Sequence, residues 1–268
     1  MQTELIMLGT GNAAVTRCYN TCFLLRTPRT TLLVDGGGGN GILRQLEDAQ
    51  VDLNEIHDVF LTHAHTDHVL GAVWVLRMVA QRMVAGKYDG MLRVMGNARV
   101  IRVLAGICRL TLPDKLTALF DDRIELLEVE DREEFTVGDF AMQAFDIRSS
   151  KEEQFGFVAE LPDGQRLACL GDEPCNEQCE RYVEDVDWLM CEAFCLYRDR
   201  DRFKPYEKHH STTLDAGRLA GRLNVGHLLL YHTEDKTLPD RKRLYTEEAA
   251  REFGGEIHVP DDLEKIIL

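Results

Sequence analysis

Four residues with metal-binding side chains fall within six positions of this chain. They are His63, His65, Asp67 and His68, in the stretch LTHAHTDHVLG at 61–71. In an extended backbone the side chains of residues i and i+2 point to the same side, so two imidazoles can face one point. The next carboxylate and imidazole follow where the chain turns into a predicted helix, and they can face a neighbouring point. Imidazole and carboxylate together suit zinc, iron or manganese, which predicts a site for one or two divalent ions.

Two further candidate ligands follow apolar strands far along the chain. Asp172 comes after RLACLG (166–171), and its carboxylate could bridge two cations that share one hydroxide. Taken alone, Asp172 would be interpreted as the N-cap of a helix. His232 ends the apolar strand HLLLYH (227–232), where a lone histidine is more often a core residue. Both become candidate ligands because the histidine-rich stretch is present.

A loop with two adjacent histidines could contribute proton chemistry. Thr212 and Asp215 form a capping-box pattern, which predicts that a helix begins there. His209 and His210 lie on the loop before that helix. The pair is therefore either free to reach a site or simply solvated, and the residues alone leave both interpretations open.

The stretch H-A-H-T-D-H resembles the H-x-H-x-D-H signature of the metallo-β-lactamase fold superfamily, and the resemblance extends along nearly the whole chain. The branch that it resembles is the ribonuclease Z group of phosphodiesterases. The glycine turn of that group is matched by MLGTGNAA (7–14), and its strand-turn aspartate by Asp35 in LLVDGG, which the resemblance implies to support the metal loop. The metal ligands that the resemblance implies are His63, His65, Asp67, His68, Asp172 and His232.

The same resemblance implies catalytic roles. Its E-A motif is matched by Glu192 and Ala193, and its H-S-T motif begins at His210. His210 would protonate the leaving oxygen, and Glu192 would orient His210. Asp67 would ligate metal and help to position the nucleophile.

One family position lacks its histidine. The family places a metal-binding histidine upstream of a glycine–aromatic pair, but the matching segment, FDIRSSKEEQFGF (145–157), has Ser149 and Ser150 there. A serine hydroxyl is a poor neutral ligand for zinc. We therefore expect a weakened first site and a complete second one. The first site keeps His63, His65 and Asp172, and the second keeps Asp67, His68, Asp172 and His232.

Nearby carboxylates could replace the missing imidazole. The candidates in the same segment are Asp146, Glu152 and Glu153. A carboxylate ligand would shift the preference from zinc toward manganese or iron.

The resemblance implies an α/β fold, a metallo-β-lactamase-like αββα sandwich of two mixed sheets flanked by helices, as a single domain over 1–268. The hydrophobic pattern also favours two helix-covered sheets over a doubly wound sheet, and no linker interrupts the chain. The predicted strands are 4–8, 21–27, 30–35, 58–62, 92–96, 123–129, 140–147, 155–161, 166–171, 187–193, 227–232 and 256–260. The predicted helices are 41–50, 68–85, 97–110, 174–184, 212–223 and 246–253.

The net charge limits which classes of substrate are expected. The chain has 46 acidic and 31 basic residues, a net charge of −15, which disfavours a large nucleic-acid footprint. The basic, glycine-rich arm with which ribonuclease Z proteins hold tRNA has no counterpart in 69–145. We therefore expect a small phosphodiester, a cyclic nucleotide or another hydrolysable metabolite, with RNA as an alternative that the net charge disfavours.

The remaining features concern location and assembly. Stretches of 18 consecutive apolar residues are absent and MQTELIMLGTG is interpreted as a first strand, so no membrane span and a cytoplasmic location are expected. Six of the eight cysteines form three C-x3-C pairs, which are interpreted as reduced core thiols rather than a metal or electron-transfer site. Related proteins commonly dimerise, so we expect a homodimer.

Three functional hypotheses follow. The first is a metal-dependent hydrolase acting as a phosphodiesterase. The second keeps the fold but cleaves an ester, thioester or lactone, since fold does not fix chemistry. The third, suggested by the missing histidine, is a degenerate metal-binding protein without catalysis.

Overall fold

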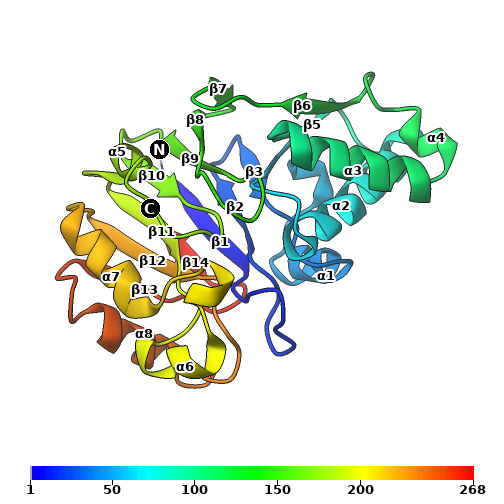
Figure 1. Ribbon diagram of the computed structural model, residues 1–268. Helices are drawn as coiled ribbons and strands as arrows, with labels where there is room; N and C mark the ends of the chain where they lie inside the picture. Colours follow the sequence, from blue (N-terminus) through cyan, green and yellow to red (C-terminus); the bar gives the residue numbers. More distant parts are fainter. Residues whose placement is uncertain (1) are drawn as a thin grey trace.

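The computed structural model describes residues 2–268, which form two packed sheets with helices on both outer faces (Figure 1). The first sheet consists of β1 (Glu4–Gly9), β2 (Cys22–Arg26), β3 (Thr31–Val34), β4 (Asp58–Leu61), β5 (Leu92–Gly96), β6 (Ile124–Glu128) and β14 (Lys265–Ile267). The second consists of β7 (Glu134–Val137), β8 (Phe140–Asp146), β9 (Phe155–Glu160), β10 (Arg166–Cys169), β11 (Trp188–Glu192), β12 (His227–Tyr231) and β13 (Glu256–His258).

The strand orders are β14-β1-β2-β3-β4-β5-β6 and β13-β12-β11-β10-β9-β8-β7. In each sheet a run of neighbouring strands is parallel, from β3 to β6 in the first and from β10 to β13 in the second, and the remaining pairings are antiparallel. Both sheets are therefore mixed, which confirms the predicted αββα sandwich.

The helices separate into two groups. Helices α1 (Gly41–Asp48), α2 (Thr66–Val84), α3 (Ala98–Thr111) and α4 (Asp114–Thr117) lie on the side of the first sheet. Helices α5 (Glu180–Val183), α7 (Thr213–Arg222) and α8 (Arg241–Ala249) cover the second, and α6 (Arg200–Phe203) lies in the connection between β11 and α7. Short 3-10 turns occupy Leu53–Glu55, Tyr197–Asp199 and Tyr206–Lys208.

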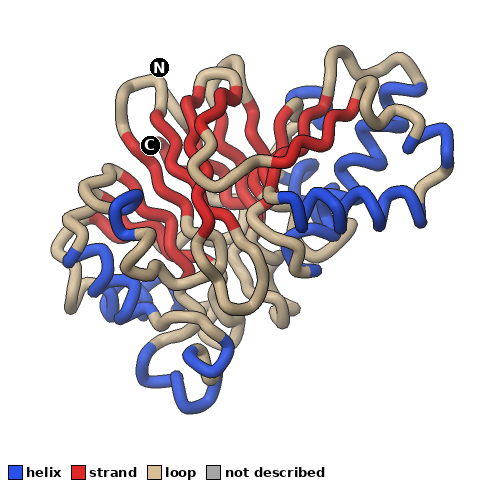
Figure 2. Tube along the Cα trace, turned by 45° about the horizontal axis from the view of Figure 1, so that its top comes forward, coloured by secondary structure: helices blue, strands red, loops and turns tan. Residues whose placement is uncertain are grey.

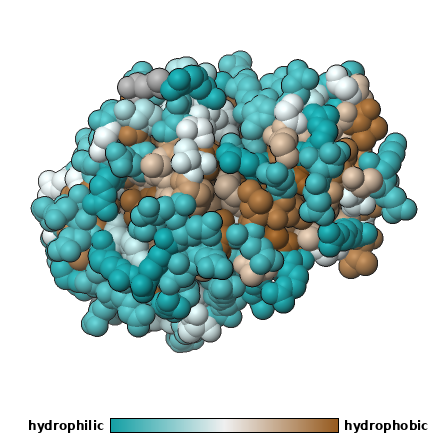
Figure 3. Space-filling model, turned by 90° about the horizontal axis from the view of Figure 1, so that it is seen from above, coloured by the Kyte–Doolittle hydropathy of each residue, from teal (hydrophilic) through white to brown (hydrophobic). Residues whose placement is uncertain are grey.

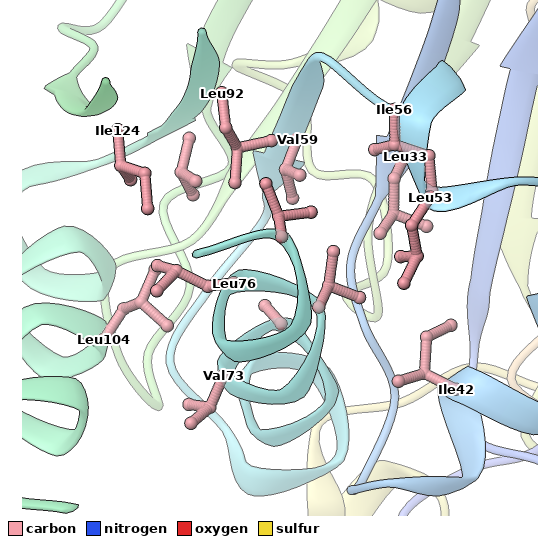
Figure 4. Close-up of a cluster of buried hydrophobic side chains, with 14 of the residues drawn as sticks. Leu33, Ile42, Leu53, Ile56, Val59, Val73, Leu76, Leu92, Leu104 and Ile124 are labelled. Atoms are coloured by element: carbon pink, nitrogen blue, oxygen red, sulfur yellow. The ribbon is translucent and has the colours of Figure 1, made fainter. Parts of the chain in front are cut away.

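Side-chain alternation builds the layers. In β1, Leu5 and Met7 belong to the core between the sheets, whereas Ile6 and Leu8 belong to the core beneath the helices. This is the two-residue period of a strand that is buried on both faces. Figure 4 shows the helix-side core, where side chains of α2 lie against those of the sheet and of α3.

The parallel runs place several chain segments at one edge. Carboxyl ends of parallel strands meet at the same edge of a sheet, where α/β proteins commonly place ligand sites. Here the ends of β4, β10, β11 and β12 lead into the loops that carry the predicted ligands. Figure 2 shows loops gathered beyond these strand ends.

Two helix predictions were wrong. The segment predicted as a helix over 174–184 is mostly turns, and only α5 is helical, because the side chain of Asn176 caps local backbone and binds the carbonyl of Ile147. Asp172 is therefore not a helix N-cap. The helix predicted over 246–253 is α8, which begins earlier, at Arg241, and ends at Ala249. Its first turn, residues 241–243, is charged, so the hydrophobic periodicity does not show where the helix begins.

Short edge elements were not predicted. Strands β7 and β14 and helix α4 are three or four residues long, too short for a periodic signal. Strand β14 exists because Lys265–Ile267 pair antiparallel with β1. Within residues 2–268, no helix has the length and apolar character to cross a membrane. The eight cysteines are free thiols.

Candidate metal centre

The predicted ligands converge on the strand-end edge in two groups that share one carboxylate. In the first group, Nε2 of His63 lies 2.9 Å from Nδ1 of His65 and 3.6 Å from Oδ1 of Asp172. These three residues could hold an ion together, since their donor atoms lie within 4.8 Å of one another.

The second group lies on the other side of Asp172. Oδ2 of Asp67 is 3.5 Å from Nε2 of His68 and 3.5 Å from Nε2 of His232. Oδ2 of Asp172 is 3.9 Å from the first of these nitrogens and 3.7 Å from the second. Asp172 therefore turns one oxygen to each group, so its carboxylate could contribute a ligand to both.

The donor atoms fit a divalent ion. Nε2 of His68, Nε2 of His232 and Oδ1 of Asp172 are buried without a hydrogen-bond partner. Burying polar atoms without hydrogen-bond partners costs free energy, so this group is expected to bind a ligand in addition to the side chains. Separations of 3.5 to 3.9 Å in the second group exceed hydrogen-bond length but suit atoms that surround one cation at about 2.0–2.2 Å.

Asp35 fixes the protonation of two ligand histidines. Its Oδ1 accepts a hydrogen bond from the backbone N–H of Thr62 (2.9 Å), and its Oδ2 accepts from Thr62 Oγ1 and from Nδ1 of His68 (2.8 Å each). A carboxylate can only accept, so Nδ1 of His68 carries a proton, and Nε2 is the nitrogen that binds an ion once its own proton has left.

The network continues through Thr62 to a second imidazole. The Thr62 hydroxyl has one proton, which it donates to Asp35, so it accepts from Nδ1 of His63 at 2.9 Å. Nε2 of His63 is thereby left as a lone pair facing the first group. Asp35 was expected to support the metal loop, and the structure shows it doing so through both histidines. Thr62 was missed because a threonine before a histidine carries no motif.

His232 is held in an unusual backbone conformation. Its φ is +57°, a left-handed value that costs free energy for a residue with a side chain. The next residue compensates: the Thr233 N–H donates to the carbonyl of Thr10, and the Thr233 carbonyl accepts from Asn12. The glycine-containing turn at 7–14 thus anchors the loop that aims His232 at the centre.

Glu192 and His210 lie beside the second group. His210 is packed flat on the ring of Phe194, with the ring centroids 4.7 Å apart, and its Nδ1 lies 3.7 Å from Oε2 of Glu192. The other oxygen of Glu192 accepts from the backbone N–H of Ser211. Burial raises the pKa of Glu192 to about 8, and burial together with His232 lowers the pKa of His210 to about 3. The carboxyl is therefore protonated and the imidazole neutral at pH 7.

Charges within the ligand groups are strongly coupled. Burial lowers the pKa of His63 well below its ordinary value, which keeps the imidazole neutral and able to bind a cation. Burial opposes protonation of His68 as well, but the carboxylates of Asp67 and Asp35 outweigh it and raise its pKa. Burial would raise the pKa of Asp172, but the surrounding histidines hold it well below its usual range. A positive charge at this centre is thus strongly favoured.

The segment that lacks the family histidine supplies no replacement carboxylate. Asp146 pairs with Arg148, and Glu153 is exposed. Glu152 lies 3.7 Å from Nε2 of His65, the nitrogen on the far side from His63, and also accepts from the Ala64 N–H. It therefore orients His65.

The two serines at the expected histidine position are engaged elsewhere. Oγ of Ser149 accepts from the backbone N–H of Lys151, and Oγ of Ser150 lies 3.0 Å from Nδ1 of the exposed His209. The residue that does reach the first group is Lys151, which sequence reasoning missed.

Fold and site together define a protein of the metallo-β-lactamase fold. The solved structure of the metallo-β-lactamase fold protein YhfI from Bacillus subtilis is similar to this chain with a TM-score of 0.79, at 17% sequence identity and full coverage of both chains. The short form of human tRNase Z (ELAC1) is similar with a TM-score of 0.74, at 20% identity and 98% coverage of each.

Sequence comparison identifies the family within this fold. It belongs to the family described as Anti-Pycsar protein Apyc1, whose profile matches residues 3–243. A ribonuclease Z of Kineococcus radiotolerans is 28% identical over 302 aligned positions, which cover 98% of this chain and 94% of that protein. The predicted resemblance to ribonuclease Z-like proteins of this superfamily is confirmed.

Proposed function

We propose that this protein is a metal-dependent hydrolase, a phosphodiesterase related to ribonuclease Z that acts on a small phosphodiester. The observation that carries the proposal is the position of Asp172, whose two oxygens face two groups of imidazoles, the second of which, at Nε2 of His68 and His232, is buried without hydrogen-bond partners. Residues in this arrangement would hold divalent ions, which would supply Lewis acidity toward water and a phosphoryl group. The ribonuclease Z relatives support the choice of a phosphodiester bond.

Zinc is the proposed ion, because imidazoles dominate the donor set, with manganese or iron as alternatives. One or two ions would be held, by Asp67, His68, Asp172 and His232 and by His63, His65 and Asp172. A bound divalent ion supplies Lewis acidity, which makes water more acidic and offsets charge on phosphoryl oxygens.

The chain's own residues supply positioning and a proton. Asp67 lies at the junction of the second group, where its carboxylate can orient the attacking water as well as ligate. His210 gives the proton of Nε2 to the leaving oxygen, and the protonated Glu192 replaces it by donating to Nδ1 across the present 3.7 Å separation. The pair begins with two protons, one on Glu192 and one on Nε2 of His210, and ends with one, on Nδ1 of a neutral histidine beside a carboxylate. Phe194 holds the imidazole plane during the transfer.

A small substrate such as a cyclic nucleotide fits the charge better than RNA does. A net charge of −15 repels a long polyanion, whereas a single phosphodiester needs only local positive charge. Hydrolysis of an ester, thioester or lactone on the same fold is the second candidate, since the same ions would polarise a carbonyl.

The test is a substrate panel on reconstituted protein. Chelator-treated enzyme is loaded with zinc or manganese and assayed with bis-p-nitrophenyl phosphate, cyclic mononucleotides, p-nitrophenyl acetate and a short RNA. We expect hydrolysis of the small phosphodiesters, lost at least about 100-fold in Asp172→Asn because the bridging charge is gone. Asp163→Asn makes the same chemical change on an exposed turn and serves as the control.

The other outcomes decide between the hypotheses. Faster cleavage of the acetate than of any phosphodiester would replace our proposal with an esterase. Tight metal binding without hydrolysis of any substrate would favour the non-catalytic alternative.

Assembly and location are proposed on separate grounds. Exposed large apolar side chains include Trp74 of α2, Leu110 of α3 and Leu127 of β6, and Figure 3 shows apolar surface on the half of the molecule that carries these elements. A patch of this kind supports a homodimer, which sedimentation equilibrium would test. Eight free thiols support a reducing, cytoplasmic location.

A further inference from the structure

Lys151 reaches the cation position that lacks a histidine. It lies in the loop between β8 and β9, directly after the two serines at the expected histidine position. Its Nζ is 3.9 Å from Oδ1 of Asp172, and the same oxygen lies 3.6 Å from Nε2 of His63. The ammonium therefore lies beside the Asp172 oxygen that faces the first ligand group.

The lysine is held in this place by a second carboxylate. Its Nζ is 2.8 Å from Oε2 of Glu173, and only 18% of its side chain is exposed, against 7% for Glu173. A nearly buried carboxylate is stable only with a partner, so this pair restricts where the ammonium can go. The loop itself is tied down because Phe155 donates its backbone N–H to the Thr62 carbonyl, beside the ligand histidines.

An ammonium and a divalent ion compete for the same position. A protonated lysine has three donors and no lone pair, so it cannot ligate, and it repels a cation that approaches Asp172 Oδ1. His63, His65 and one carboxylate oxygen are left as the remaining donors, without the third imidazole. The second group has its own carboxylate, Asp67, and two imidazoles, and the Asp172 oxygen nearest to it is Oδ2 rather than the Oδ1 that Lys151 approaches.

We infer that Lys151 replaces the cation of the first site: the protein holds one divalent ion tightly, at Asp67, His68, Asp172 and His232, and uses the Lys151 ammonium as the positive group that binds a phosphate oxygen of the substrate. This inference rests on the proposed phosphodiesterase function for its substrate and deepens it. An ammonium is a common point-charge ligand of phosphate.

Metal counting tests the first half of the inference without any assay of activity. Zinc binding to chelator-treated protein is measured by competition with a chromophoric chelator, and tightly held zinc is counted by mass spectrometry after gel filtration. All proteins carry His258→Ala, because His227, Glu256 and His258 form another donor group at the other end of the strands. Circular dichroism and thermal unfolding check that each variant folds.

The expected result is one tight zinc per chain, with the second equivalent bound at least about 100-fold more weakly. Lys151→Gln removes the charge and is expected to strengthen that second equivalent at least about tenfold. Lys151→His is expected to bring the count to two, since its shorter arm leaves room for a metal–nitrogen bond of about 2 Å. Lys87→His, a matched change at an exposed residue, is expected to leave one.

Phosphate binding tests the second half. Inorganic phosphate is titrated calorimetrically into zinc-loaded protein at one equivalent, with Lys151→Arg retaining the charge and Lys151→Gln removing it. We expect the arginine variant to stay within about threefold of the original affinity and the glutamine variant to lose about tenfold or more. If Lys151→His does not fold, Lys151→Gln and Lys151→Arg still decide both halves.

Two results would overturn the inference. Two equivalents of zinc bound to the unchanged protein with dissociation constants within tenfold of each other would show that the lysine does not exclude an ion. Unchanged zinc and phosphate affinities in Lys151→Gln would show that Lys151 only neutralises Glu173. Failure of the proposed function looks different: the predicted zinc counts would be observed, but phosphodiesters would not be hydrolysed.

Discussion

Replacing Asp35 by asparagine should weaken metal binding although Asp35 itself is not a ligand. Asp35 accepts three hydrogen bonds, from the Thr62 N–H, from Thr62 Oγ1 and from Nδ1 of His68. Asparagine has one oxygen and one NH2 group, so at least one of these three donors must face the NH2 group, which is itself a donor. Either orientation of the amide disturbs the centre.

The two orientations have different costs. With NH2 in place of Oδ1, the buried Thr62 N–H loses its acceptor, which costs about 1–3 kcal/mol of folding stability. With NH2 in place of Oδ2, His68 must accept at Nδ1 and move its proton to Nε2, which blocks the lone pair that faces Asp67 and His232. Loss of such an outer hydrogen bond typically costs 10- to 100-fold in metal affinity, or about 1.4–2.7 kcal/mol.

The assay compares the asparagine variants of two buried aspartates, Asp35 and Asp58. Zinc dissociation constants are measured by chelator competition, and stability by urea unfolding of the metal-free protein. Asp58 is the matched control, because it is buried like Asp35 (6% and 3% exposed) but lies at the start of β4, paired with Arg93. Asp58→Asn should destabilise the fold and leave zinc affinity unchanged. If Asp35→Asn binds zinc within about threefold of the original protein, the tautomer argument is wrong.

Three further changes follow from the same contacts. In metal-free protein the pKa of Glu192 is raised to about 8 from an ordinary 4.5, so between pH 5 and 8 the native state holds a proton that the unfolded state has lost. The free energy of unfolding should therefore fall by up to about 1.4 kcal/mol per pH unit in this range. Urea unfolding of Glu192→Gln should no longer show this slope. Arg241 is 1% exposed and donates to Thr10, Thr233 and Pro260, so Arg241→Met should cost about 3 kcal/mol in urea unfolding, whereas the same change at its exposed neighbour Arg243 should cost far less. Gly171→Ala should lower the free energy of unfolding by at least about 1 kcal/mol more than Gly86→Ala, because both have φ near +65° but only at Gly171 would the new Cβ lie 2.5 Å from Gln154. The first prediction is wrong if the free energy of unfolding does not change with pH in the original protein or in Glu192→Gln. The second and third are wrong if the two arginine variants, or the two glycine variants, lose equal free energy of unfolding.

The sequence predicted the sandwich because its strands are long apolar runs with turn residues between them. Strands such as β1 and β12 are buried on both faces, which leaves a signal that needs no tertiary information. Strand β14 has no such signal, since three residues become a strand only because β1 offers them an open edge. Helix 174–184 was predicted wrongly because side-chain caps of Asn176 compete with helical hydrogen bonds.

The candidate site was predictable where spacing or strand ends fix it. The alternation of His63 and His65 after β4 needs only local geometry, and Asp172 and His232 each follow an apolar strand. The supporting residues were not predictable in the same way. Thr62 acts by accepting a hydrogen bond from His63, which no sequence motif indicates. Lys151 reaches the site only because its loop follows a path that hydrogen bonds to Asn97 and Thr62 determine. The roles assigned to Asp67, Glu192 and His210 stay predictions that the experiments above address.

The most direct test of the central claim is an anomalous-scattering map from crystals of the protein grown with zinc, recorded on both sides of the zinc absorption edge. We predict a strong peak among the side chains of Asp67, His68, Asp172 and His232, within about 2.0–2.2 Å of their donor atoms. A map with no peak at these residues, in crystals whose solution protein has been saturated with zinc, would contradict the claim that these distant parts of the chain converge to hold a catalytic ion.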